Sequence, residues 1–260
     1  MDNKSYEIIL RTKEPFRVGG VSDPLSGAEN PVTIVGSRAV IPGPSLKGAY
    51  RAELERYLIE QYFDKDAGKW EDGKDDFKPC IPSPEKQLSN DERKLIERGM
   101  YKASGCHYPC DPKPYKCGNT LHTICPVCYL LGANGLPGVV RVPFLFSDVT
   151  ADELYSARID RAVGTVTPGT NRPYSVIPDG SVFKGILTVM QKNDILKWHI
   201  GQARNWIEER SGKDAWLIDN ELPSGDLIQN LIVERIENIN ILGGFKSKGC
   251  GKVEISVSEI

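Results

Sequence analysis

The sequence of 260 residues lacks the features of a membrane or secreted protein. No run approaches the roughly 18 consecutive apolar residues that a membrane-spanning helix needs, and residues 1–5 lack the apolar core of a secretory signal. An excess of one charge is also missing, because 33 basic and 35 acidic side chains give a formal net charge of -2. We therefore expect a cytoplasmic protein without a membrane partner. Any surface for a polyanion has to be a local patch.

The composition also lacks the bias of a disordered chain. Hydrophobic residues make up 40% and charged residues 26% of the sequence, which are ordinary values for a globular domain. The length permits one large domain or two small ones, since domains commonly have roughly 100–200 residues. We expect a sizeable buried core.

Strand and helix patterns follow one another along the chain. Alternating or β-branched runs predict strands at 5–11, 32–41, 139–147, 181–191 and 253–257. Apolar residues at three- and four-residue spacing predict helices at 45–63, 193–210 and 226–240, with Ser45 as the N-cap of the first. This order predicts an α+β fold of the ferredoxin-like (RRM-like) plan, in which helices cover one face of an antiparallel sheet.

Composition changes in residues 64–128, which are charged and rich in proline, glycine and cysteine. One short helical pattern, at about 89–101, interrupts this segment. We interpret the segment as an insertion that is held together by something other than a hydrophobic core.

Two short cysteine pairs lie in this insertion, Cys106-x3-Cys110 and Cys125-x2-Cys128. A turn of this kind lets both sulfurs face one point, and two such turns complete a tetrahedron around Zn²⁺ with no open position for catalysis. The odd total of seven cysteines also favours a metal over disulfides. The sequence therefore predicts a structural zinc site with these four ligands, although free buried thiols are the simpler alternative. Four other residues of the segment compete for the ligand positions: Cys80, His107, Cys117 and His122.

A glycine-rich loop precedes the last expected strand. Its glycines would let the chain approach a phosphate closely, and its two lysines would supply charge. An ordinary turn before a strand would have the same composition, so both interpretations stay open. The candidate RNA-binding residues of this loop are Gly243, Gly244, Lys246 and Lys248.

Two further places carry candidate cations. Lys47 and Arg51 are four residues apart near the start of the first helix, where backbone amides favour an anion. A solvated helix face is the alternative there. The segment 157–180 has hairpin potential, and its arginines could hold an RNA backbone while apolar residues insert between bases. An exposed hairpin for protein contact would look the same. Its candidate residues are Arg158, Arg161 and Arg172.

Four motifs in a fixed order resemble those of a known family. They are the run from Ile41 to Gly48 with Arg51, the Cys-Pro-Val-Cys turn before Leu130-Leu131-Gly132, the strand ending Phe146-Ser147-Asp148, and the glycine-rich loop with its two lysines. Together they resemble the RAMP superfamily of CRISPR-associated proteins. The similarity is greatest to the backbone subunit that repeats along the guide RNA in type III effector complexes, with the type I-D backbone subunit as a near relative.

This resemblance implies a ferredoxin-like palm from 1–63 and 129–260, with a β-hairpin thumb at about 157–180 and the zinc-binding insertion at 64–128. It implies that copies of the chain, or homologous backbone subunits, stack head-to-tail along a crRNA guide and position the complementary target RNA, beside other subunits of an antiviral ribonucleoprotein. Ser45, Lys47 and Arg51 would contact guide phosphates.

The resemblance leaves catalysis open. Active members cut target RNA with an aspartate in the loop before the Ile-Pro-Gly motif, and here Asn30 stands at that place. An amide neither takes a proton nor binds Mg²⁺ as a carboxylate does. The chain is then either a non-cutting subunit or a metal-dependent endoribonuclease in which Asp23 or Glu29 substitutes. A zinc-stabilised protein-interaction module without RNA is the third alternative.

Overall fold

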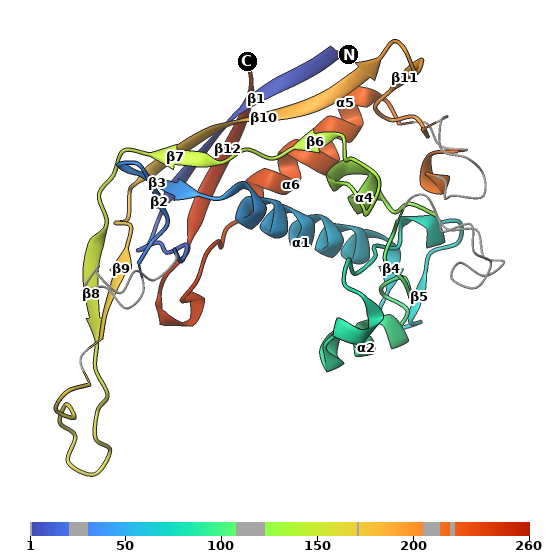
Figure 1. Cartoon of the computed structure of the whole chain (residues 1–260). Helices are drawn as coiled ribbons and strands as arrows, with labels where there is room; N and C mark the ends of the chain where they lie inside the picture. The colour runs from blue at the N-terminus through green and yellow to red at the C-terminus, as the bar shows by residue number, and fades with distance from the viewer. Residues whose placement is uncertain (1, 21–30, 108–122, 171, 205–213, 219–221) are drawn as a thin grey trace. The chain divides into compact units, whose positions relative to one another are not determined.

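The computed structural model (Figure 1) describes residues 2–20, 31–107, 123–170, 172–204, 214–218 and 222–260. The chain forms two compact units. Unit 1 comprises Met1–Ser5, Tyr50–Arg141 and Thr188–Arg235, and unit 2 comprises Tyr6–Ala49, Val142–Leu187 and Ile236–Ile260. Helices and an antiparallel sheet are both present, so the predicted α+β class is confirmed. Among the described residues no helix is both long and apolar enough to cross a membrane.

An antiparallel sheet forms the centre of unit 2. Its first strand, β1 (Asp2–Thr12), pairs with the last, β12 (Val253–Glu259), from Tyr6↔Glu259 to Thr12↔Val253. Alternate side chains of β1 are buried, because successive residues of a strand point to opposite faces of the sheet. The strand order is β12-β1-β10-β7-β3-β2, with β10 at Val182–Asn193, β7 at Leu145–Ser147, β3 at Arg38–Ile41 and β2 at Ile34–Val35.

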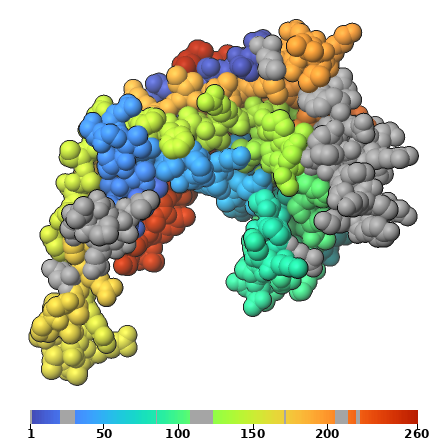
Figure 2. Space-filling view, in the orientation of Figure 1, coloured from blue at the N-terminus to red at the C-terminus, as the bar shows by residue number. Residues whose placement is uncertain are grey.

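A long hairpin extends from unit 2. Strand β8 (Asp152–Ser156) pairs with β9 (Arg172–Val176), and most of the loop between them is exposed. Figure 2 shows the yellow end of this hairpin standing clear of the blue and red parts of unit 2. The hairpin potential predicted for this part of the chain is thus present, and the strands begin earlier than expected, at Asp152.

Helix α1 spans Gly43–Tyr62, close to the predicted 45–63. It begins at Gly43, so Ser45 lies in the first turn and the prediction that Ser45 is the N-cap was wrong. The first turn packs closely on a neighbouring segment, because a Cβ on Gly43 would lie 3.1 Å from the carbonyl oxygens of Val142 and Pro143. A larger residue at Gly43 would require that backbone to move by a few tenths of an ångström.

Unit 1 contains short elements around an aromatic centre. Trp216 packs against Phe77 and Tyr129 with ring centroids 5.5 and 5.4 Å apart, and Tyr129 packs against Trp198 at 6.1 Å. Strands β6 and β11 pair with the last part of β10, and β4 pairs with β5. The bounds are Val140–Arg141 for β6, Trp198–His199 for β11, Phe63–Asp64 for β4, Lys69–Trp70 for β5, Asn90–Glu97 for α2 and Pro126–Leu131 for α4.

The predicted helix at 226–240 is present as one helical run with an unusual middle. It continues from α5 (Ser224–Leu227) through a π-helical stretch, η5 (Ile228–Val233), into α6 (Glu234–Glu237). Side chains bind carbonyl oxygens within the π-helical stretch. The Tyr50 hydroxyl donates to Leu231 O at 2.7 Å, and Arg235 Nε donates to Asn230 O at 3.0 Å.

The helix predicted at 193–210 was wrong over its described part. Residues 194–197 form a turn, and β11 then pairs back onto β10 through Lys192↔His199. Gly201 has φ +99°, and a Cβ there would lie 2.1 Å from Leu222 O, so the backbone departs from a helix at this point. The apolar spacing within residues 193–204 therefore reflects burial of Trp198 and Ile200 beside β10.

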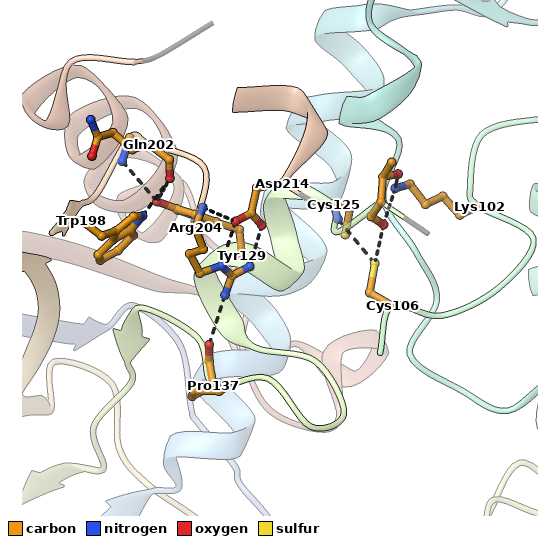
Figure 3. A network of polar contacts seen from close by, with 11 residues as sticks. Lys102, Cys106, Cys125, Tyr129, Pro137, Trp198, Gln202, Arg204 and Asp214 are labelled. Carbon is orange, nitrogen blue, oxygen red and sulfur yellow. Dashed lines mark hydrogen bonds and ion pairs between the residues drawn. The ribbon is translucent and has the colours of Figure 1, made fainter. Parts of the chain in front are cut away.

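One buried ion pair fixes this region of unit 1 (Figure 3). Arg204 donates from Nε to Asp214 Oδ2 at 2.8 Å and from Nη2 to Oδ1 at 2.6 Å, and its guanidinium lies 4.9 Å from the centre of the Tyr129 ring. The side chains are only 2% and 0% exposed. The bidentate geometry satisfies both charges, as burial of a charge requires.

Candidate metal centre and nucleic-acid interface

Four cysteines of unit 1 converge on one point: Cys80, Cys106, Cys125 and Cys128. We call this group the cysteine cluster. All four sulfurs lie within 4.8 Å of one another, with Cys80 Sγ 3.4 Å from Cys128 Sγ and 3.9 Å from Cys125 Sγ. A tetrahedron with Zn–S bonds of about 2.3 Å has sulfurs about 3.8 Å apart. The cluster therefore has the donor set and the size of a structural zinc site.

Local structure turns the sulfurs inward. Cys125 is the N-cap of α4 with extended backbone, Pro126 follows at the helix start, and Cys128 lies in the first turn. Backbone amides donate to two of the sulfurs. Cys106 N donates to Cys80 Sγ at 3.4 Å, and Cys125 N donates to Cys106 Sγ at 3.4 Å (Figure 3). Such amides stabilise a thiolate, which is the form that binds metal.

The acidity of the cluster also favours a cation. Burial raises the pKa of the Cys125 thiol, but hydrogen bonds from the three neighbouring sulfurs and the charge of Lys102 leave that pKa well below its ordinary value. Hydrogen bonding with Cys125 and burial raise the pKa of the Cys106 thiol. The shifts have opposite signs because the thiols share hydrogen bonds in a buried site, and a bound divalent cation would favour the thiolate form of all four.

Three of the four predicted ligands belong to the cluster, and Cys110 lies outside the described residues, as do Cys117 and His122. Cys80, which the sequence offered only as a competitor, is the fourth sulfur of the cluster. His107 is described and is not in the cluster; its Nδ1 lies 3.2 Å from Gly105 O. Cys80 has no second cysteine at chelating distance along the chain, so the spacing rule gave no signal for it.

Arg51 lies beside this cluster. Its Nη2 is 3.8 Å from Cys128 Sγ, and its Nη1 donates to Glu55 Oε1 at 3.2 Å. The side chain is only 16% exposed. Burial raises the pKa of the Glu55 carboxyl to about 7 in spite of this ion pair. The guanidinium predicted to contact a phosphate thus has partners inside unit 1.

The other candidate residues of α1 lie in unit 2. Lys47 is exposed and Ser45 is half-buried in the first turn of the helix. The Ser45 amide donates to Pro42 O at 2.9 Å. Lys47 is therefore the more accessible of the two.

The glycine loop (residues 243–251) has a backbone that few other residues could adopt. Gly243 has φ +89°, and a Cβ there would lie 2.4 Å from Arg17 O. The same Arg17 carbonyl accepts a hydrogen bond from Gly244 N at 2.7 Å. Lys246 and Lys248 follow in a short exposed turn, η6 (Lys246–Lys248). The loop thus holds two accessible cations on a fixed backbone.

Phe245, between these glycines and lysines, is packed by residues from three segments of unit 2. The Arg17 guanidinium lies 4.6 Å and Lys248 Nζ 4.4 Å from the ring centre, and Tyr174 of β9 meets the ring edge-on at 5.2 Å. Phe245 itself has a left-handed backbone, with φ +59°. Arg17 was not among the residues predicted to form a site, and the Arg-Val-Gly-Gly run at 17–20 is its one local signal in the sequence.

The hairpin carries the remaining candidates. Arg158, Arg161 and Arg172 are all exposed. Large apolar side chains are exposed beside them: Tyr155, Ile159, Val163 and Val166. The candidate catalytic residues Asp23 and Glu29, and Asn30 with them, lie outside the described residues.

Comparison with known proteins gives a family. The model of the RAMP superfamily matches residues 9–254. No curated protein matches the sequence. RAMP proteins generally bind crRNA within CRISPR effector complexes. Because the match covers nearly the whole chain, the protein belongs to the RAMP superfamily of CRISPR-associated proteins.

Proposed function

We propose that this chain is a guide-RNA-binding backbone subunit of a type III-like CRISPR effector complex in the cytoplasm. Copies of it, or of homologous subunits, stack head-to-tail along the crRNA and position the target RNA. The observation that carries the proposal is the hairpin of unit 2, on which exposed arginines lie near exposed apolar side chains in the sequence. Arginines hold a phosphate backbone, and apolar or aromatic side chains separate and stack on bases.

The architecture fits this role. We propose that the antiparallel sheet and the helices after β3 and β10 form a ferredoxin-like palm from 1–63 and 129–260, and that the hairpin is its thumb. Residues 64–128 would form the zinc-binding insertion. All four cysteines of the cluster lie in this range.

The glycine loop and the start of α1 supply further RNA contacts in this proposal. Lys246, Lys248 and Lys47 are exposed cations that can follow a backbone of phosphates. Gly243 and Gly244 let the chain come close to it. Nothing in such contacts reads a base edge, so sequence specificity would belong to the guide.

The zinc site is structural in this proposal. We infer that Cys80, Cys106, Cys125 and Cys128 hold one Zn²⁺, which would contribute folding free energy to a segment with few apolar residues. All four positions are taken by protein, so no site is left for substrate. Target cleavage is not part of the proposal, because Asn30 stands where the resemblance implies an aspartate.

RNA binding is tested by its salt dependence. The double variant K246Q/K248Q should bind a single-stranded RNA of guide length more weakly, with the slope of log K against log salt reduced by about 0.7 for each phosphate that the loop no longer neutralises. The control is K86Q/K94Q, which removes two lysines near α2 and should leave the slope unchanged. Equal slopes for both double variants and the wild type would remove the glycine loop from the RNA path. Copurification without any short RNA at low salt would contradict the function itself.

A further inference from the structure

The cysteine cluster poses a charge problem. Four thiolates around one divalent cation leave two negative charges in excess. This excess would lie among side chains that are mostly buried: Cys80, Cys125 and Cys128. A buried net charge is costly unless cations or hydrogen bonds offset it. The residues around the sulfurs should therefore include positive charge.

Arg51 is one such residue. Its Nη2 faces Cys128 Sγ at 3.8 Å, within reach of an N–H···S hydrogen bond. Its other terminal nitrogen, Nη1, is held by Glu55 at 3.2 Å, and the Tyr101 hydroxyl approaches the second oxygen of Glu55 at 3.4 Å. These contacts fix the plane of the guanidinium, which aims one edge at the cluster.

Lys102 is the other, and it joins two cysteine-bearing segments. Its backbone forms a β-bridge with Cys80 and donates to Pro79 O at 2.9 Å. Its Nζ donates to Thr123 O at 2.9 Å, and that carbonyl oxygen lies 3.6 Å from Cys106 Sγ (Figure 3). Lys102 thus ties the Cys80 turn to the residues that precede Cys125, and its ammonium group contacts the same carbonyl oxygen as Cys106 Sγ.

We propose that Arg51 and Lys102 are positioning residues of the metal centre, whose two positive charges offset the excess negative charge of the tetrathiolate site and hold its ligands in place. The inference rests on the zinc site proposed above. Arg51 then serves unit 1, and its guanidinium is not available to a guide phosphate as the helix pattern had predicted. The proposal assigns the RNA side of α1 to Lys47 alone.

Metal affinity tests the proposal directly. The purified, zinc-loaded full chain and its R51M and K102M variants are titrated with a chromogenic chelator that competes for zinc. Each substitution keeps much of the side chain's length but removes its charge. Loss of such a partner of a metal ligand typically weakens metal affinity by about 10–100-fold. The controls are R56M on the same helix and K94M on α2, whose surface ion pairs touch no sulfur. Both controls should keep the wild-type affinity.

A spectroscopic readout separates positioning from general stability. With Co²⁺ in place of zinc, R51M should shift the thiolate-to-metal charge-transfer band, because one sulfur no longer has its N–H donor. R51K and K102R should restore most of the affinity, which also covers the case in which a methionine variant fails to fold. The proposal is overturned if R51M and K102M match the two controls in affinity and spectrum. It is equally overturned if R51M keeps its zinc and loses RNA binding, since Arg51 would then be a phosphate contact. A wild-type chain that binds no zinc would refute the metal site itself.

Discussion

The two units of the chain use polar chemistry in opposite places. Unit 1 has it inside, with four converging sulfurs and a carboxylate–guanidinium pair whose side chains are at most 2% exposed. Unit 2 has it mostly outside, on the arginines of the hairpin and the lysines of the glycine loop, around a sheet whose inward side chains are mainly apolar. Internal polar groups must satisfy one another, whereas external ones are free to meet a ligand. The difference separates what holds unit 1 together from the charged surface that unit 2 exposes.

Loss of the metal should produce the largest difference in stability between the two units. The variant C125S/C128S should lose about one zinc per chain, and unit 1 should lose most of its stability, because structural zinc contributes about 10–16 kcal/mol in small zinc peptides. Amide hydrogen exchange would show faster exchange in α4 and near Cys80, with protection along the β1–β12 pairing retained. Equal loss of protection in both units would contradict the idea that the metal stabilises unit 1 alone. Unchanged metal content would contradict the site.

Breaking the buried ion pair between Arg204 and Asp214 should have the next largest effect on stability. Asp214→Asn should lower the free energy of unfolding by about 3–5 kcal/mol, since it leaves the Arg204 charge buried without a partner. Chemical denaturation measures the change. The matched control is K13M, which breaks the surface pair between Lys13 and Glu254 in unit 2 and should have little effect. Similar changes for the two variants would show that the pair in unit 1 is open to water.

A smaller effect is expected at the glycine loop. Gly243→Ala should cost about 1–3 kcal/mol, because it puts a side chain on a left-handed residue and against Arg17 O. The control G249A has a similar φ of +75° but nothing within 4 Å of the added Cβ. It should therefore cost less and preserve the loop. If thermal denaturation and RNA binding show the same losses for both, the contact with Arg17 does not hold the loop.

Strand and helix positions were largely predictable where one face of an element is buried. Residues 5–11 and 253–257 alternate because they form neighbouring strands of the sheet, and the spacing in α1 follows from burial of Leu46, Tyr50 and Leu54. The helix predicted at 193–210 was wrong over residues 193–204, because the buried Trp198 and Ile200 lie in and directly after β11. Local periodicity cannot tell this arrangement from a helix, since the path of the chain after β11 depends on Gly201 and its contact with Leu222.

The candidate sites also differ in whether local sequence predicts them. The Cys-Pro-Val-Cys turn was predictable because both of its ligands lie in one short run of chain. Cys80 was not, because its place in the cluster depends on the distant contact between its turn and Lys102. The contacts of Arg17 and Arg51 have the same property: Arg51 was a candidate phosphate contact in the sequence and Arg17 was not, and only folding brings Arg17 to Phe245 and Arg51 to Cys128.

The π-helical stretch at Ile228–Val233 has a consequence for how the length of this chain can vary. A π turn bonds residue i to i+5, so it holds one residue more than an α-helix over the same rise. Deleting one residue there would restore the ordinary ladder over the same rise, so α6 would keep its orientation. Arg235 would then stay beside the Tyr57 ring, 4.1 Å away, and the Glu53 carboxylate at 3.9 Å. A relative that lacks this extra residue can therefore retain the partners of α6, and a one-residue gap in an alignment at this helix is expected to fall within the π-helical stretch.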